Sequence, residues 1–112
     1  MKKRIVFFLP IIFLIISCNS FETKKIDLLN SPMKILIEDY NVDSVYSLRL
    51  IITGYINGKA IIKLDDIKEI IVENNFVFEY GADWYSNEAI IYYEPIDCNQ
   101  GKIKIKYQFF SL

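Results

Sequence analysis

Four carboxylates that fall close together in the sequence are the first side chains to consider for chemistry. They are Asp65, Asp66, Glu69 and Glu73. Closely spaced carboxylates can bind Ca²⁺, but a calcium loop also needs alternating Asp or Asn ligands and a glycine at its sharp turn. This stretch has neither feature. We therefore expect the four acids to lie on a solvated turn and strand edge, and we predict no metal site.

Catalysis by a nucleophile has little support in this sequence. Histidine is absent, which removes Ser-His and Cys-His pairs and every His-based metal site. No glycine-rich phosphate loop is present, and Cys98 lies in a polar turn without a base that would activate its thiol. Two carboxylates could act as a glycosidase pair, but nothing singles out one pair. We predict a protein that is not an enzyme and that needs no cofactor.

One polar loop has the composition of a recognition surface. The segment EYGADWYSNE, residues 79–88, places Tyr80, Asp83, Trp84 and Tyr85 among small polar neighbours. Tyr and Trp with adaptable small residues are typical of recognition loops, and both are enriched at binding hot spots. The alternative is that Trp84, the only tryptophan, belongs to the core or supports the loop. The four residues are our predicted contacts for a protein partner.

The elements that must position this loop are predicted to be strands. Residues 102–109 show the clearest period of two, with apolar side chains on one face and mainly lysines on the other. Further strands are expected at residues 33–40, 46–56, 59–64, 76–80 and 88–94. Residues 65–75 are ambiguous, because Ile67, Ile70 and Ile71 have helical spacing. Their β-branched side chains favour a strand over residues 69–73.

The dipeptide Asn57-Gly58 predicts a tight β-hairpin. Asn-Gly supplies the two consecutive positive φ angles that a type I′ turn requires. The expected register pairs Ile51 with Leu64, Thr53 with Ile62, and Tyr55 with Ala60. Both faces of such a hairpin would be largely apolar, so we expect it to lie inside a layered or strongly curled sheet.

The N-terminus has the pattern of a secretory signal. Lys2, Lys3 and Arg4 precede twelve residues, Ile5 to Ile16, in which only Pro10 interrupts the apolar run. A helix that spans a membrane needs about 20 apolar residues, so this run is too short for a permanent span. A basic start, a short apolar stretch and a small residue before the cut indicate a cleaved signal peptide.

The residues Ile15-Ile16-Ser17-Cys18 resemble the lipobox of bacterial lipoproteins. That pattern has an aliphatic residue, a variable second position, a small residue and a cysteine; Ile16 departs from the usual Ser, Thr or Ala. The resemblance implies cleavage before Cys18, a diacylglyceryl thioether on its sulfur, and acyl chains such as palmitate. Two or three acyl chains anchor a protein stably in a membrane. A Cys18–Cys98 disulfide is open only to a chain that is not lipidated.

These observations give the expected organisation of the chain. Residues 1–17 are the lipoprotein signal peptide, residues 18–31 the lipidated cysteine and a tether, and residues 32–112 a β-rich domain. We predict an all-β fold: a small antiparallel β-sandwich or closed β-barrel of about six or seven strands, after a cleaved signal helix.

Charge narrows the class of partner. Without residues 1–17 the chain has ten Lys or Arg and fourteen Asp or Glu, a net charge of −4. This argues against nucleic acid as a partner and against electrostatic adhesion to anionic lipid, so acyl chains must supply the anchoring.

The expected function is that of a cell-envelope lipoprotein. We predict a non-catalytic protein-binding or structural accessory module, held to a membrane through Cys18. The resemblance, with Asn19 rather than Asp after the cysteine, favours the outer membrane in a cell that has one. The alternative is an immunity or inhibitor lipoprotein that neutralises a toxin or lysozyme-like enzyme, since an acidic β-domain suits a basic target.

Overall fold

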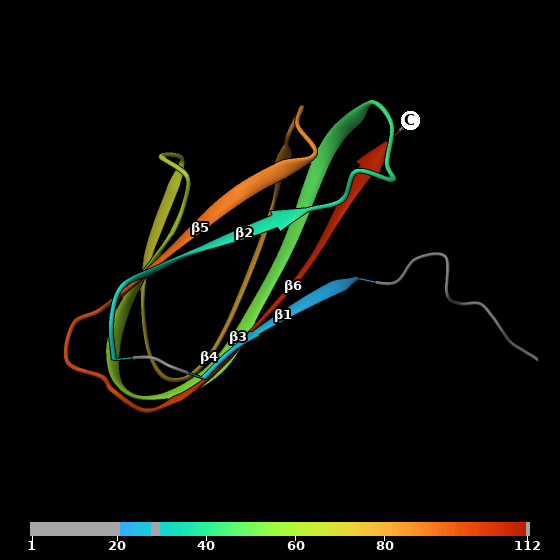
Figure 1. The fold of residues 1–112 in the computed structure, drawn as a ribbon. Helices are drawn as coiled ribbons and strands as arrows, with labels where there is room; N and C mark the ends of the chain where they lie inside the picture. The colour runs from blue at the N-terminus through green and yellow to red at the C-terminus, as the bar shows by residue number, and fades with distance from the viewer. Residues whose placement is uncertain (1–20, 28–29, 112) are drawn as a thin grey trace, which may run out of the picture.

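The computed structural model describes residues 21–27 and 30–111, and the predicted signal peptide and Cys18 lie outside them. These residues form only strands, turns and connecting segments (Figure 1). The six strands are β1 (Glu22–Ile26), β2 (Met33–Glu38), β3 (Val45–Leu64), β4 (Lys68–Asp83), β5 (Glu88–Pro95) and β6 (Gly101–Ser111). All pairings are antiparallel. The predicted all-β fold is confirmed.

A single long strand, β3, organises the sheet. The strand order is β1-β6-β3-β5-β2, and β4 also pairs with β3. Along one side of β3, residues 45–56 pair with β6 and residues 60–64 pair with β5. Along the other side, β4 accompanies β3 from end to end. β3 therefore carries both halves of the sheet.

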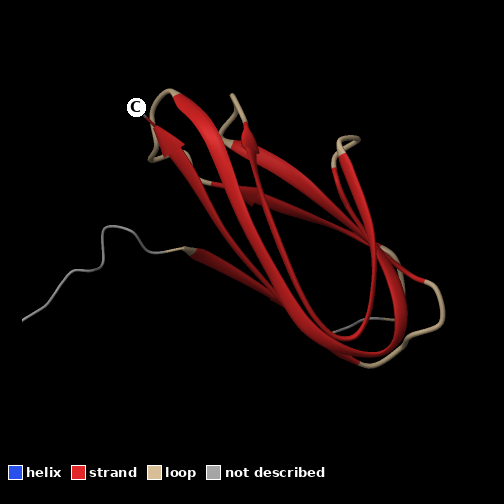
Figure 2. Ribbon diagram, turned by 180° about the vertical axis from the view of Figure 1, so that it is seen from behind, coloured by secondary structure: helices blue, strands red, loops and turns tan. Residues whose placement is uncertain are grey.

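The sheet curls into a half-barrel because β3 and β4 bend in the middle (Figure 2). We call the two halves the β6 arm and the β5 arm. The β6 arm holds β1, β6, residues 45–56 of β3 and residues 75–83 of β4. The β5 arm holds β2, β5, residues 59–64 of β3 and residues 68–73 of β4. The arms face each other as the layers of a sandwich do. β1 and β2 stand at the two ends of the strand order and do not pair with each other, so the barrel stays open.

The core fills the space between the arms. Alternate residues of each strand point inward, and most of these are Ile, Leu, Tyr or Phe. The most deeply buried large side chains are Ile37, Leu48, Leu50, Ile52, Ile56, Ile91, Tyr93, Ile103 and Ile105. The Tyr93 hydroxyl lies 2.9 Å from the sulfur of Cys98, which is also buried. Burial, and then the contact with Cys98, raise the pKa of Tyr93.

The predicted hairpin at Asn57-Gly58 is wrong. Neither residue has a positive φ, and β3 continues through both. The chain reverses instead at residues 65–67, where Asp65 has φ 46° and the Ile67 N–H donates to the Leu64 carbonyl at 3.0 Å. The expected pairs are consequently absent: Ile51, for example, lies opposite Glu79 and Lys106.

The Asn-Gly pair lies at the bend of β3, where a neighbouring loop forms hydrogen bonds with Asn57 and packs against Gly58. The Asn57 side chain donates to Asn99 Oδ1 at 2.7 Å and accepts the backbone N–H groups of Asn99 and Gln100 at 2.9 and 3.1 Å. Gly58 admits Asp97, since a Cβ there would lie 2.5 Å from Asp97 Oδ1. The register of β3 against β4 shifts here, between Tyr55 and Lys59.

Two further expectations have clear outcomes. Residues 69–73 are a strand, as the β-branched composition predicted, and belong to the longer β4. Residues 18–31 do not serve only as a tether, because Glu22–Ile26 forms β1 and pairs with β6. The side chain of Ile26 joins the buried core, which gives this segment a packing role that its polar sequence does not suggest.

Gly101 gives a direct test of how tightly the bend is packed. Its φ is +143°, and a Cβ on it would lie 2.1 Å from the Tyr55 carbonyl oxygen. Gly101→Ala is therefore expected to lower the free energy of unfolding by more than about 2 kcal/mol, measured by urea denaturation. The control is Gly81→Ala, where the nearest atom to the new Cβ is 4.0 Å away. Equal losses in both variants would contradict this packing.

Candidate protein-binding surface

Trp84 supports the loop between β4 and β5. Its indole Nε1 donates to the Glu88 carbonyl at 3.0 Å, and its backbone N–H donates to the Tyr46 carbonyl at 3.0 Å. The side chain is half-buried and packs against the core. These contacts hold both ends of the loop. Trp84 therefore supports the loop, which was the alternative to a contact with a partner.

The same loop is braced from the other side by the segment after β2. The Asn87 side chain donates to the carbonyls of Asp39 and Val42 at 2.8 and 2.6 Å. The Tyr40 hydroxyl donates to the Glu88 carboxylate. That hydrogen bond is the main reason that the pKa of Tyr40 is raised to about 12. The loop is thus fixed at several points.

The other three predicted contact residues do not converge on one site. Tyr80 is half-buried and stacks on Phe78, with ring centroids 6.2 Å apart. Asp83 is exposed at the end of β4, and Tyr85 is 78% exposed. Asp83 and Tyr85 are accessible to a partner, and their role in contact stays a prediction.

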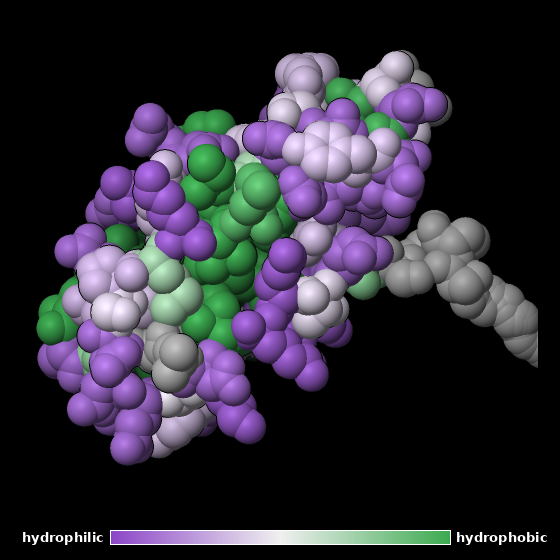
Figure 3. Space-filling model, in the orientation of Figure 1, coloured by the Kyte–Doolittle hydropathy of each residue, from purple (hydrophilic) through white to green (hydrophobic). Residues whose placement is uncertain are grey.

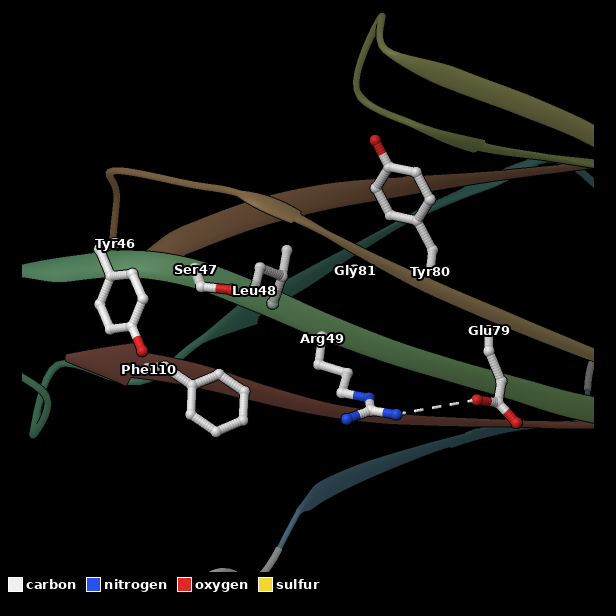
Figure 4. Close-up of a pocket in the computed structure, with 8 residues that line it drawn as sticks. All are labelled: Tyr46, Ser47, Leu48, Arg49, Glu79, Tyr80, Gly81 and Phe110. Atoms are coloured by element: carbon white, nitrogen blue, oxygen red, sulfur yellow. Dashed lines mark ion pairs between the residues drawn. The ribbon is translucent and has the colours of Figure 1, made fainter. Parts of the chain in front are cut away.

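A shallow hollow of about 410 Å³ lies on the outer face of the β6 arm, around Gly81 (Figure 4). Arg49 and Glu79 form an ion pair across it at 4.0 Å, and both are well exposed. Such exposed pairs contribute little stability. The Ser47 hydroxyl donates to the Ala82 carbonyl at 3.3 Å. The charged side chains of the hollow, Arg49 and Glu79, are therefore paired with each other, and the Ser47 hydroxyl is bonded to the backbone.

The most unusual surface is the outer edge of β4. This strand has sixteen residues and pairs with β3 along one side. Within the described residues, no strand pairs with its other side. A long sheet edge presents unpaired N–H and C=O groups that can accept another strand, and proteins usually cover or shorten such edges.

Exposed apolar side chains gather on and beside β4. Ile67, in the turn before it, is 60% exposed, Ile71 is 64% exposed and Val77 is 69% exposed. Of the other large apolar residues described, only Tyr40 and Tyr85 are 60% exposed or more. A partner strand that paired with the free edge of β4 would also cover these apolar side chains.

The outer face of β4 is also acidic. The acidic side chains that are exposed along it are Glu69, Glu73, Glu79 and Asp83. Of the four carboxylates first considered for calcium, Glu69 and Glu73 lie on this strand, and Asp65 and Asp66 lie in the turn before it. In the described part of the chain, no three His, Cys, Asp or Glu residues are grouped so that they could hold a metal ion.

A second apolar region lies where the half-barrel is open. A strip of apolar side chains crosses the middle of the face shown in Figure 3, in the region of β2. A hollow of about 490 Å³ is lined there by residues 24–27 and 33–36. Residues 28–29, which belong to the connection between β1 and β2, lie outside the described residues, so we assign no role to this hollow.

Comparison with known proteins adds no relative. The chain matches no model of a known protein family, and no curated protein is similar to it in sequence. Among the residues that the structure describes, there is no helix with the length and apolar character needed to cross a membrane.

Proposed function

We propose that this chain is a lipid-anchored protein of the bacterial cell envelope that binds another protein along the outer edge of β4 and has no catalytic activity. The lipid is attached to Cys18, as the resemblance of residues 15–18 to a lipobox implies. The anchoring membrane is the outer membrane in a cell that has one. The protein acts as an accessory or structural module.

The single observation that carries the binding role is the unpaired edge of β4 together with exposed Ile71 and Val77. An extended segment of a partner can add to such an edge, so that backbone hydrogen bonds supply affinity and side chains supply specificity. Asn74, with φ 53°, divides the edge into residues 68–73 and 75–83. Each part is as long as an ordinary strand.

The acidic side chains of β4 bear on the charge of the partner. Lys63 and Lys59 of β3 lie opposite Glu69 and Glu73, and Arg49 is paired with Glu79. A basic segment would therefore mainly complement Asp83 and the net charge of −4. Complementary charge speeds association and suppresses wrong partners. This feature also favours the second candidate function, in which the chain neutralises a basic toxin or lysozyme-like enzyme. An activity assay of the partner separates the two functions. An enzyme that the chain neutralises loses activity when the purified chain is added, whereas a structural partner has no enzymatic activity to measure.

Site-specific photo-crosslinking in living cells tests this proposal. A photoreactive phenylalanine analogue placed at Ile71 or at Val77 is expected to give one discrete crosslinked product. Ile96 is the matched control, because it is 51% exposed but lies in the connection after β5, on the other side of β3 from β4. Glu73→Lys, combined with the analogue at Ile71, is expected to weaken the crosslink by about tenfold, since the change removes the acid opposite Lys59 and leaves two positive charges that repel a basic segment.

Two results would contradict the proposal. The first is a crosslink at Ile96 of the same strength as those at Ile71 and Val77. The second is the absence of any product at both β4 positions while the protein is present at its normal level. Either result would mean that the β4 edge is not the contact surface.

A further inference from the structure

The outer face of β1 and β6 carries a group of exposed lysines. Lys25 lies on β1, and Lys102, Lys104 and Lys106 lie on β6. All four point outward because the alternate residues of β6, such as Ile103 and Ile105, are buried. We call these four residues the lysine face.

The charges of the lysine face are not compensated by their neighbours across the strands. Lys104 lies directly opposite Lys25, and its other neighbour is Thr53. Lys106 lies between Thr23 and Ile51. Within the described residues, no ion pair involves any of the four lysines. Like charges directly opposite each other destabilise a sheet, so this arrangement needs another reason.

The β5 arm shows what compensation looks like in the same sheet. There Lys63 lies opposite Glu69, and Lys59 lies opposite Glu73. Lys59 and Lys63 thus lie opposite acids on the β5 arm, whereas Lys104 and Lys106 on the β6 arm lie opposite Lys25, Thr23 and uncharged residues of β3. The net charge of −4 does not reveal that positive charge is concentrated on the lysine face. Acids more than about 10 Å away are screened by salt and have little effect on what this face contacts.

The lysine face is hollowed at its centre. A depression of about 370 Å³ is lined by Lys25, Lys102 and Lys104, with Thr53 and Tyr55 between them. Asp27 is the acidic residue in this lining. Each lysine ammonium offers three hydrogen-bond donors. A phosphate group that enters the depression would face three positive charges.

The position of the predicted anchor places this face near a membrane. Only residues 19–21 separate Cys18 from Glu22, where β1 begins. At full extension the chain covers about 3.5 Å per residue, so Glu22 lies within about 14 Å of the lipidated cysteine. Of the acids on the strands of the same arm, Glu79 and Asp83 lie on β4, which is at the opposite side of the arm from β1. Glu22 lies on β1 itself, but three positions from Lys25, so its side chain is on the other face of the strand.

We propose that the lysine face docks on anionic lipid headgroups and so fixes the orientation of the domain on the membrane. This inference rests on the proposed lipidation of Cys18, which brings β1 to the bilayer. The phosphates of the headgroups supply the negative charge that Lys25 and Lys104 do not meet on the neighbouring strands. In this orientation the β4 edge, across the β6 arm, stays accessible to a protein partner.

The test uses the mature lipoprotein reconstituted in vesicles of phosphatidylcholine, with or without about one third phosphatidylglycerol. Lysines are modified with an acylating reagent, and each site is quantified by mass spectrometry. With phosphatidylglycerol, modification of the lysine face is expected to slow by about threefold or more, and added salt is expected to restore it. Lys34 and Lys63 are internal controls, because they lie beside Tyr92 on the β5 arm.

The double variant Lys102→Glu/Lys104→Glu is expected to remove the protection of Lys25 and Lys106. Lys34→Glu/Lys63→Glu is the matched control and is expected to leave that protection intact. Flotation with phosphatidylcholine vesicles reports the lipid anchor separately, so a chain without lipid fails flotation and is recognised as a failure of the proposed function.

Two outcomes would overturn the docking surface. Equal modification in both kinds of vesicle, by a protein that floats with both, would show that the face does not contact lipid. Equal protection by soluble glycerol phosphate without anionic vesicles would show a site for a free phosphate compound instead.

Discussion

Replacement of Cys18 by serine is expected to abolish lipid attachment completely. The proposed thioether would form on the Cys18 sulfur, and serine offers no thiol for it. In the lipoprotein family that residues 15–18 resemble, cleavage before the cysteine goes with that modification, so the variant is also expected to keep residues 1–17. Incorporation of a labelled fatty acid, followed by electrophoresis, measures the first effect, because the label disappears. Detection of the protein itself on the same gel measures the second, because the band moves to a larger size.

Cys98→Ser is the control for this experiment. Cys98 is buried beside Tyr93 in the β-domain, far in sequence from the signal peptide, so its replacement is expected to leave the label and the cleavage unchanged. If the Cys18→Ser chain still incorporated fatty acid, the anchor would have to be elsewhere. If Cys98→Ser lost the label as well, the effect would not be specific to the lipobox.

Trp84→Ala is expected to lower the free energy of unfolding by about 2–4 kcal/mol. The variant loses the packing of a half-buried indole against the core, and it leaves the Glu88 carbonyl without its donor. Full burial of a tryptophan would give about 3–5 kcal/mol. A domain of this size has about 5–14 kcal/mol in total, so a clear fall in the melting temperature is expected.

Tyr85→Ala, one residue further on, is the matched control for Trp84→Ala. Tyr85 is 78% exposed, and substitutions at such positions usually change stability by less than about 0.5 kcal/mol. Fluorescence is a convenient second measurement, because the chain has a single tryptophan. A Trp84→Ala variant as stable as the wild type would show that the indole serves binding and not the loop.

The strands were predictable because their information is local. Period-two alternation in residues 102–109 follows from one face meeting the core and the other meeting water, and β6 has that arrangement. The β-branched residues 69–73 likewise gave the correct element, although their spacing also suits a helix. Tyr92 and Tyr93 separate to opposite faces of β5 for the same reason.

The bend of β3 was not predictable in the same way, because it depends on residues far away in the sequence. Asn57 could form a type I′ turn, but its side chain bonds with Asn99 instead. Gly58 is required for the approach of Asp97 rather than for a positive φ. Those partners lie about forty positions further on, and nothing in the dipeptide itself shows that they will arrive.

The candidate site was also predictable only in the features that depend on local sequence. The composition of residues 79–88 indicated a loop with structural or binding importance, and Trp84 does brace that loop. The β4 edge was missed because an edge is a property of the strand order and not of one strand. The apolar residues Ile71 and Val77 were the only sign of this surface in the sequence. They indicate a binding edge only once the structure shows that they are exposed and that β4 pairs on one side.

Above all, we propose that the mature protein is held to a membrane by lipid on Cys18. The most direct measurement is the mass of the N-terminal peptide of the protein purified from its native membrane. We expect a peptide that begins at Cys18 and carries a diacylglyceryl group on the cysteine, with or without a further acyl chain on the new amino terminus. A peptide that begins at Met1, or an unmodified Cys18, would contradict it.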